Sequence, residues 1–158
     1  MLTSASRSEH ISSPSRWIAP PINQLRLDID AAYNVNFNRY AIGGVVQNHE
    51  GQILLAFGKQ ITKPPSIVAA ELIAIEEGFQ MTLTQHLRIN QITSDSLMAV
   101  QAVTSPTEDF GYTGAFATKI RNLLATHAHL KLEHVLRTAN GVAHSLAYFA
   151  ISSPSPFV

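Results

Sequence analysis

One stretch near the start of the chain, residues 25–33, constrains the fold more than any other. Its apolar residues alternate with Arg26, Asp28 and Asp30, which is the two-residue period of a β-strand. Aspartate is disfavoured in strands, yet two aspartates share one face of this one. We therefore predict that this strand is central in a sheet and that Asp30, at its end, belongs to a functional site.

The composition excludes several classes of protein. A chain of 158 residues with 46% hydrophobic residues suits a single domain with a proper core. The formal net charge is zero, so there is no global basic field of the kind that marks many nucleic-acid binders. There is no cysteine for disulfide or thiolate chemistry. Its apolar runs are far shorter than the ~20 residues of a membrane helix.

We therefore expect a soluble, intracellular protein that is not bound to a membrane. The nucleus or cytoplasm is favoured, and an organelle is the alternative. Residues 1–16 are rich in serine with one acidic residue, and we predict a disordered tail or linker, with a transit peptide as the alternative. Residues 17–150 form the predicted domain, and residues 151–158 have the composition of a disordered tail.

The domain is expected to begin with three antiparallel strands. They cover residues 25–33, 41–47 and 52–58, joined by polar turns. Gly43 and Gly44 indicate a bulge or the close approach of another backbone. Beyond them we predict helices over residues 66–85, 95–103, 113–127 and 140–150, capped at Ser66 and Asn140, and strands over residues 87–93 and 131–137. Right-handed crossovers would make these last two strands parallel to the first.

Two further carboxylates are predicted to join Asp30. Ligands in open α/β sheets collect at the carboxyl ends of parallel strands, and Asp30 and Asp95 would both lie there. Glu71 falls early on the covering helix, within its apolar stripe, where a carboxylate is costly unless it is paired or binds metal. The simpler alternatives are a Glu71 that reaches water from the edge of the stripe and an Asp95 that caps a helix.

Three converging carboxylates repel one another unless a cation lies between them. Hard oxygen ligands without cysteine favour Mg²⁺ or Mn²⁺ over zinc. The sequence therefore predicts a metal site at this edge of the sheet.

Five motifs, in this order along the chain, resemble those of a known family. They are Trp17 and Pro20-Pro21 leading into Asp30-Ala-Ala, then residues 42–48, residues 70–78 around Glu71, Ser94-Asp95-Ser96, and residues 134–147 with Asn140-Gly-Val-Ala-His144. Over residues 17–150 the chain resembles the ribonuclease H domain, of the reverse-transcriptase-like type that is common in plant retroelement-derived proteins.

The resemblance implies an α/β, ribonuclease H-like three-layer fold, with a five-stranded mixed sheet of three antiparallel strands and then two parallel ones, and helices on both faces. It implies a monomeric, metal-dependent endoribonuclease that hydrolyses the RNA strand of RNA–DNA hybrids, directed to RNA by the 2′-hydroxyl. Family members bind two Mg²⁺ (or Mn²⁺) ions through four acidic positions. Carried over residue by residue, the catalytic and metal-binding positions are Asp30, Glu71, Asp95 and His144. The expected substrate-binding residues are Gly43, Gly44, Asn48, Ser96, Arg137 and Asn140.

The fourth position departs from the family, because His144 stands where an aspartate is usual. A neutral imidazole can ligate Mn²⁺, but it is a poor Mg²⁺ ligand and brings no negative charge. A surface histidine is the alternative. Ala31 also replaces the usual glycine, and a basic protrusion for gripping a hybrid is missing. Two other hypotheses stay open: a catalytically weak or inactive domesticated module that binds nucleic acid or a protein, and an exonuclease or integrase-like relative.

Overall fold

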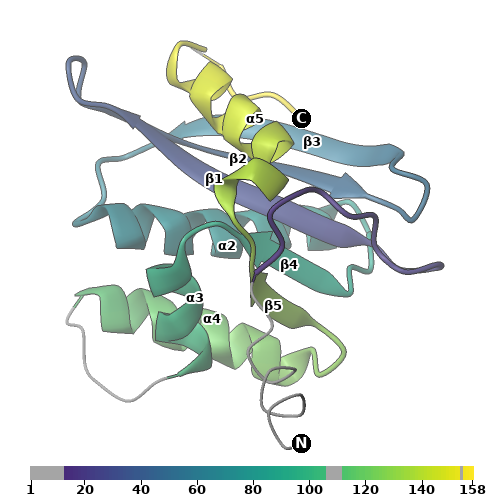
Figure 1. The fold of residues 1–158 in the computed structure, drawn as a ribbon. Coiled ribbons are helices and arrows are strands. Elements are labelled where there is room, and N and C mark those ends of the chain that lie inside the picture. Colours follow the sequence, from purple (N-terminus) through teal and green to yellow (C-terminus); the bar gives the residue numbers. More distant parts are fainter. Residues whose placement is uncertain (1–12, 106–111, 154) are drawn as a thin grey trace, which may run out of the picture.

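A five-stranded mixed sheet forms the centre of the structure, in the order β3-β2-β1-β4-β5 (Figure 1). The computed structural model describes residues 13–105, 112–153 and 155–158. The strands β1 (Arg26–Asn34), β2 (Arg39–Gln47) and β3 (Ile53–Ile61) form an antiparallel meander. The strands β4 (Gln91–Ser94) and β5 (Lys131–His134) continue the sheet parallel to β1. The predicted strand directions are confirmed.

Helices cover both faces of this sheet (Figure 1). On one face lie α2 (Ile67–Thr84), α3 (Leu97–Thr104) and α4 (Tyr112–Thr126). On the other face α5 (Gly141–Ile151) packs across β1, β2 and β3, after a short 3-10 turn, η1 (Arg137–Ala139). The predicted three layers are therefore confirmed.

The alternation in β1 separates the core from the site. Leu27 and Ile29 are fully buried and pack on α2 where Gly78 lets the helix come close. Because successive side chains in a strand point to opposite faces, Asp28 and Asp30 lie on the face that α5 covers. The largest buried side chains, among them Leu72, Ile75 and Ile120, fill the layer between the sheet and the helices opposite α5.

Gly43, the first glycine of the pair in β2, marks a close approach of two backbones, which was one of the two expected possibilities. A Cβ on Gly43 would overlap the backbone of Leu146 and Ala147 in α5. Gly43 is also the cross-strand partner of Asp30, so the same contact holds α5 beside that carboxylate. The irregularity in the ladder lies elsewhere, between Val46 and Gln47.

Several element boundaries differ from the prediction. The fourth strand begins at Gln91, later than expected, because residues 87–90 connect α2 to the ladder with β1. The fifth strand ends early, at His134, because the chain then turns into η1. The cap at Ser66 is confirmed, with its side chain accepting from the Ala69 backbone N–H at 3.0 Å. Asn140 precedes α5 as expected, but its side chain makes no capping bond.

Parts of both expected tails are docked on the domain. The Leu136 N–H donates to the Pro14 carbonyl at 2.8 Å. At the other end Gly58 and Phe157 exchange two backbone hydrogen bonds of 3.0 Å on the free edge of β3. Serine-rich composition favours disorder, but here tertiary partners satisfy the backbone. Residues 1–12 and 154 lie outside the described residues. Across the described parts of the chain, we find no helix with the length and hydrophobicity needed to cross a bilayer.

The seam between β2 and α5 gives a direct test of the packing. We expect Gly43→Ala to lower the free energy of unfolding by about 1–3 kcal/mol, because backbone atoms cannot move aside as a flexible side chain can. Gly141→Ala is the matched control, since a Cβ there meets nothing within 4 Å, and its effect should stay within ~0.5 kcal/mol. Equal denaturant midpoints for the two variants would contradict this packing.

Candidate metal centre

The end of the β1–β4 pairing brings two aspartates side by side. The parallel ladder ends at the pair Ile29 and Ser94, and Asp30 and Asp95 are the next residues on the two strands. The prediction that Asp30 lies at the end of its strand was wrong, because β1 continues beside β2 as far as Asn34. Asp30 lies instead where β1 loses its partner β4.

Glu71, near the start of α2, completes a group of three carboxylates. One oxygen from each of Asp30, Glu71 and Asp95 lies within 4.8 Å of the others. Asp30 is fully buried, Glu71 is 6% exposed, and the Asp95 side chain is also 6% exposed. The alternative of a Glu71 that reaches into water is therefore wrong.

Burial and the repulsion between neighbouring carboxylates raise the pKa values of Glu71 and Asp30. The pKa of Glu71 is raised to about 9, mainly by burial and to a lesser extent by the charges of Asp30 and Asp95. The pKa of Asp30 is raised to about 6, mainly by burial and then by the charge of Asp95, while the neighbouring His144 acts in the opposite direction. Without a cation, the site therefore favours bound protons.

Each carboxylate also keeps one buried oxygen without a hydrogen bond. These atoms are Asp30 Oδ1, Glu71 Oε2 and Asp95 Oδ2. Asp95 Oδ2 lies 3.3 Å from Arg137 Nε, within ion-pair distance but outside hydrogen-bond geometry. Buried polar atoms without partners are costly, and a hard divalent cation would satisfy all three at once. The residues present thus fit such an ion.

Asp95 is free for this role because a neighbour caps the helix. Ser96 Oγ accepts from the Ala99 N–H at 3.2 Å, so Ser96 is the N-cap of α3. Ser94 Oγ accepts in turn from the Ser96 N–H at 3.1 Å. The alternative that made Asp95 the cap was wrong.

His144 lies in the first turn of α5 and contacts the site through Asp30. Its Nδ1 is 2.8 Å from Asp30 Oδ2, and its side chain is 35% exposed. Its ring also lies 6.1 Å from that of Tyr148, centroid to centroid. His144 is therefore attached to the site through one carboxylate, and the group of three ligand atoms within 4.8 Å does not include it.

The structure separates the expected substrate-binding residues into two groups. Ser96 and Arg137 lie beside Asp95, and the Arg137 side chain is 65% exposed. Asn48 lies in the turn after β2, next to Gln47, whose partner Arg26 begins β1. It is therefore beside the start of β1, whereas Asp30 lies in the middle of that strand. There Asn48 Oδ1 accepts from the backbone N–H groups of the turn.

The other three positions have packing roles and present no exposed surface to a substrate. Gly43 and Gly44 are buried, beneath α5 and the Phe57 ring respectively. Asn140 is 1% exposed, and its Nδ2 donates to the Ile29 carbonyl at 2.8 Å. Gly43 and Asn140 hold α5 against the sheet beside Asp30, and Gly44 leaves room for the Phe57 ring.

Sequence reasoning did not include His134 among the site residues. His134 pairs with Ser94 across the β4–β5 ladder, and its Nε2 lies 3.3 Å from the Asp95 carbonyl oxygen. Its Nδ1 lies 2.6 Å from Ser13 Oγ. The signal was present, because His134 ends a parallel strand on the same side of the sheet as Asp95.

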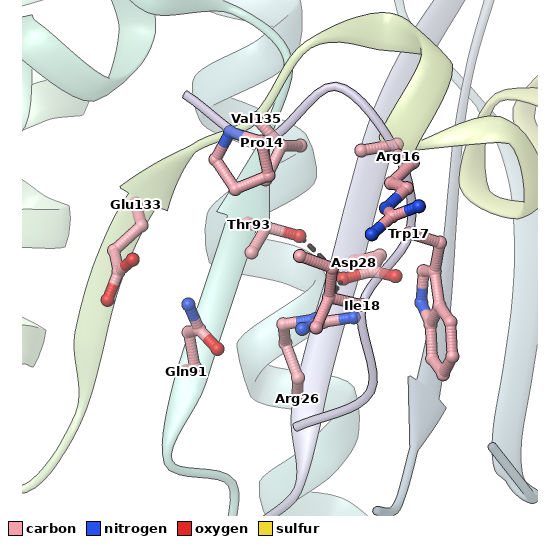
Figure 2. Close-up of a pocket in the computed structure, with 11 residues that line it drawn as sticks. Pro14, Arg16, Trp17, Ile18, Arg26, Asp28, Gln91, Thr93, Glu133 and Val135 are labelled. Atoms are coloured by element: carbon pink, nitrogen blue, oxygen red, sulfur yellow. Dashed lines mark hydrogen bonds and ion pairs between the residues drawn. The ribbon is translucent and has the colours of Figure 1, made fainter. Parts of the chain in front are cut away.

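Asp28, the second aspartate of β1, is not part of the group of three. Figure 2 shows its carboxylate among Arg26, Thr93 and Trp17. Asp28 Oδ1 accepts from Arg26 Nε at 2.9 Å and from Thr93 Oγ1 at 2.5 Å. The Arg26 guanidinium stacks 5.3 Å from the Trp17 ring centroid. The cavity beside them measures about 40 Å³, so Asp28 has a structural role.

The order and spacing of these residues agree with a family model described as reverse transcriptase-like, which matches residues 28–150. The chain belongs to the reverse transcriptase-like family. No curated protein matches the chain.

Solved structures show that the fold is that of ribonuclease H. Ribonuclease H1 of the halophilic archaeon Halobacterium salinarum NRC-1 is 21% identical, with a TM-score of 0.67 over 81% of this chain and 97% of that one. LC11-RNase H1, isolated from compost and crystallised in complex with an RNA/DNA hybrid, is 19% identical, with a TM-score of 0.64 over 81% and 96%. The prototype foamy virus protease–reverse transcriptase is 13% identical, with a TM-score of 0.64 over 93% of this chain and 22% of that one.

The raised pKa values of Glu71 and Asp30 predict how stability depends on pH without cations. The pKa of Glu71 rises from its ordinary value of 4.5 to about 9 in the folded protein, and that of Asp30 rises from 3.8 to about 6. At pH values between the ordinary and the folded pKa of each group, the folded protein binds more protons than the unfolded chain. The free energy of unfolding should therefore fall as the pH rises through this range. Glu71→Gln removes the titrating group, so in EDTA near pH 8 it should be more stable than wild type by about 1–3 kcal/mol.

Urea unfolding at several pH values, with EDTA or Mg²⁺, measures this effect. Mg²⁺ should stabilise the wild type more than Glu71→Gln. If the free energy of unfolding in EDTA had the same pH dependence in the wild type and in Glu71→Gln, the pKa of Glu71 would not be raised in the folded protein.

Proposed function

We propose that this protein is a divalent-cation-dependent endoribonuclease that hydrolyses the RNA strand of RNA–DNA hybrids. The observation that carries the proposal is the group of three buried carboxylates, each with an oxygen that makes no hydrogen bond. The family match and the ribonuclease H fold support it. The structures of two proteins that share this fold were solved in complex with an RNA/DNA hybrid, LC11-RNase H1 and the foamy viral protease–reverse transcriptase.

In this proposal Asp30, Glu71 and Asp95 hold Mg²⁺ or Mn²⁺ through their free oxygens. A divalent cation in such a site activates the attacking water and stabilises the leaving oxygen. Arg137 is exposed beside Asp95, and its guanidinium suits a phosphate of the substrate backbone. Ser96 is half-buried at the same edge and could contact the next sugar or phosphate.

We expect this protein to bind nucleic acid weakly. The net charge is zero, and two lysines near the sheet and α4 are already paired, Lys59 with Glu77 and Lys119 with Glu76. A protein without an excess of positive charge neutralises few phosphates and releases few counterions, so affinity should be low and should depend only shallowly on salt. His144 at the fourth position, together with this charge balance, is the reason to keep a second candidate: a catalytically weak or inactive module of the same fold that binds nucleic acid or a protein without cutting.

Cleavage of an RNA–DNA hybrid with labelled RNA, in Mg²⁺ and in Mn²⁺, tests the proposal. Glu71→Gln and Asp95→Asn should each lower the rate by roughly 100-fold or more, because each removes a cation ligand worth several kcal/mol in the transition state. Glu77→Gln is the matched control on the same helix, since Glu77 pairs with Lys59 away from the site, and its rate should stay near wild type.

Two outcomes would contradict the proposal. One is undiminished cleavage by Asp95→Asn, and the other is cleavage in EDTA. A wild type that binds the hybrid but cuts it with neither cation would support the second candidate instead.

A further inference from the structure

We infer that His144 restricts the carboxylate site to a single divalent cation and orients Asp30 to bind it. The inference rests on the cation site of the proposed function, and it departs from the two ions that the family resemblance implies. In it His144 is a positioning residue, which acts through Asp30.

The two oxygens of Asp30 are divided between different partners. Oδ2 lies 2.8 Å from His144 Nδ1, while Oδ1 has no hydrogen-bond partner. A carboxylate that bridges two cations needs one oxygen for each. The His144 imidazole lies where a second cation on Oδ2 would have to approach, so Oδ1 is the oxygen of Asp30 that no other group engages.

The chemistry of the contact also excludes Nδ1 as a ligand. An ionised carboxylate only accepts hydrogen bonds, so beside ionised Asp30 the hydrogen lies on His144 Nδ1. A nitrogen that carries hydrogen has no lone pair for a metal. Nε2, on the other side of the ring, points away from Asp30. His144 therefore supplies a hydrogen bond where the family usually has a carboxylate.

The charge at the site leads to the same conclusion. Asp30, Glu71 and Asp95 carry three negative charges when ionised, whereas two divalent cations carry four positive ones. Arg137 adds a positive charge 3.3 Å from Asp95. A second cation would meet net repulsion in a buried site, where electrostatic interactions are strong.

The fold keeps His144 in this position. α5 is held against β2 by the contact of Ala147 with Gly43. It is held against β1 at its start, where Asn140 Nδ2 donates to the Ile29 carbonyl. These two anchors lie on either side of His144 along the chain, so the helix cannot withdraw the imidazole from Asp30.

Binding of Mn²⁺ alone to the chelator-treated full chain tests the inference. Calorimetry should give one Mn²⁺ per chain for the wild type, and paramagnetic resonance should show an isolated ion. His144→Asp should bind two, with the magnetic coupling of ions about 4 Å apart. His144→Ala should keep one site with roughly 10–100-fold weaker affinity, because the orientation of Asp30 is lost.

His129→Asp is the matched control for the added charge. His129 is exposed in the turn before β5, at the end of that strand remote from the site, and the variant should still bind one ion. If His144→Asp does not fold, the number of ions bound by the wild type still tests the single site, and the weakened affinity of His144→Ala tests the part that His144 plays.

The outcomes separate this inference from the proposed function. Two coupled ions in the wild type, or a His144→Asp variant that folds and still binds one, would overturn the inference alone. Absence of any bound Mn²⁺ would overturn the cation site and the inference with it. One bound ion without hybrid cleavage would support the inference and contradict the enzymatic proposal.

Discussion

Repulsion among three buried carboxylates is the constraint on which this structure depends. Asp30, Glu71 and Asp95 lie together at the edge where β4 ends, and burial raises the pKa of Glu71 to about 9 and that of Asp30 to about 6. Such a group lowers the stability of a cation-free protein at neutral pH, so the rest of the fold must hold it together. A site that is unfavourable when empty gains most from a bound cation, which is the basis of the proposed function.

The packing that holds the site is specific and uses small residues. Leu27 and Ile29 fix β1 against α2, and Gly43 lets α5 lie directly on β2. Asn140, buried and bonded to the Ile29 carbonyl, ties the start of α5 to the same strand. Each contact serves both stability and the site, because β1 carries Asp30 and α5 carries the histidine that binds it.

Patterns along the chain predicted most of the fold and the three carboxylates. The alternation in β1, the order of elements and the crossover rule placed Asp30 and Asp95 at one edge, and the apolar stripe of α2 marked Glu71 as buried. Tertiary contacts decided what the sequence could not. Whether Asp95 or Ser96 caps α3 depends on which side chain reaches the Ala99 N–H, and the burial of Asn140 depends on its contact with β1. The docking of Phe157 on β3 cannot be inferred from the composition of the segment that contains it.

Anomalous X-ray scattering from crystals of the protein soaked in Mn²⁺ tests the central claim most directly, because it locates the ion without relying on activity. We expect a peak within bonding distance, about 2.2 Å, of one oxygen from each of Asp30, Glu71 and Asp95. We also expect His144 to stay hydrogen-bonded to Asp30, outside the coordination sphere. A saturated crystal with no peak between these carboxylates, or with Mn²⁺ bound by other residues alone, would contradict it.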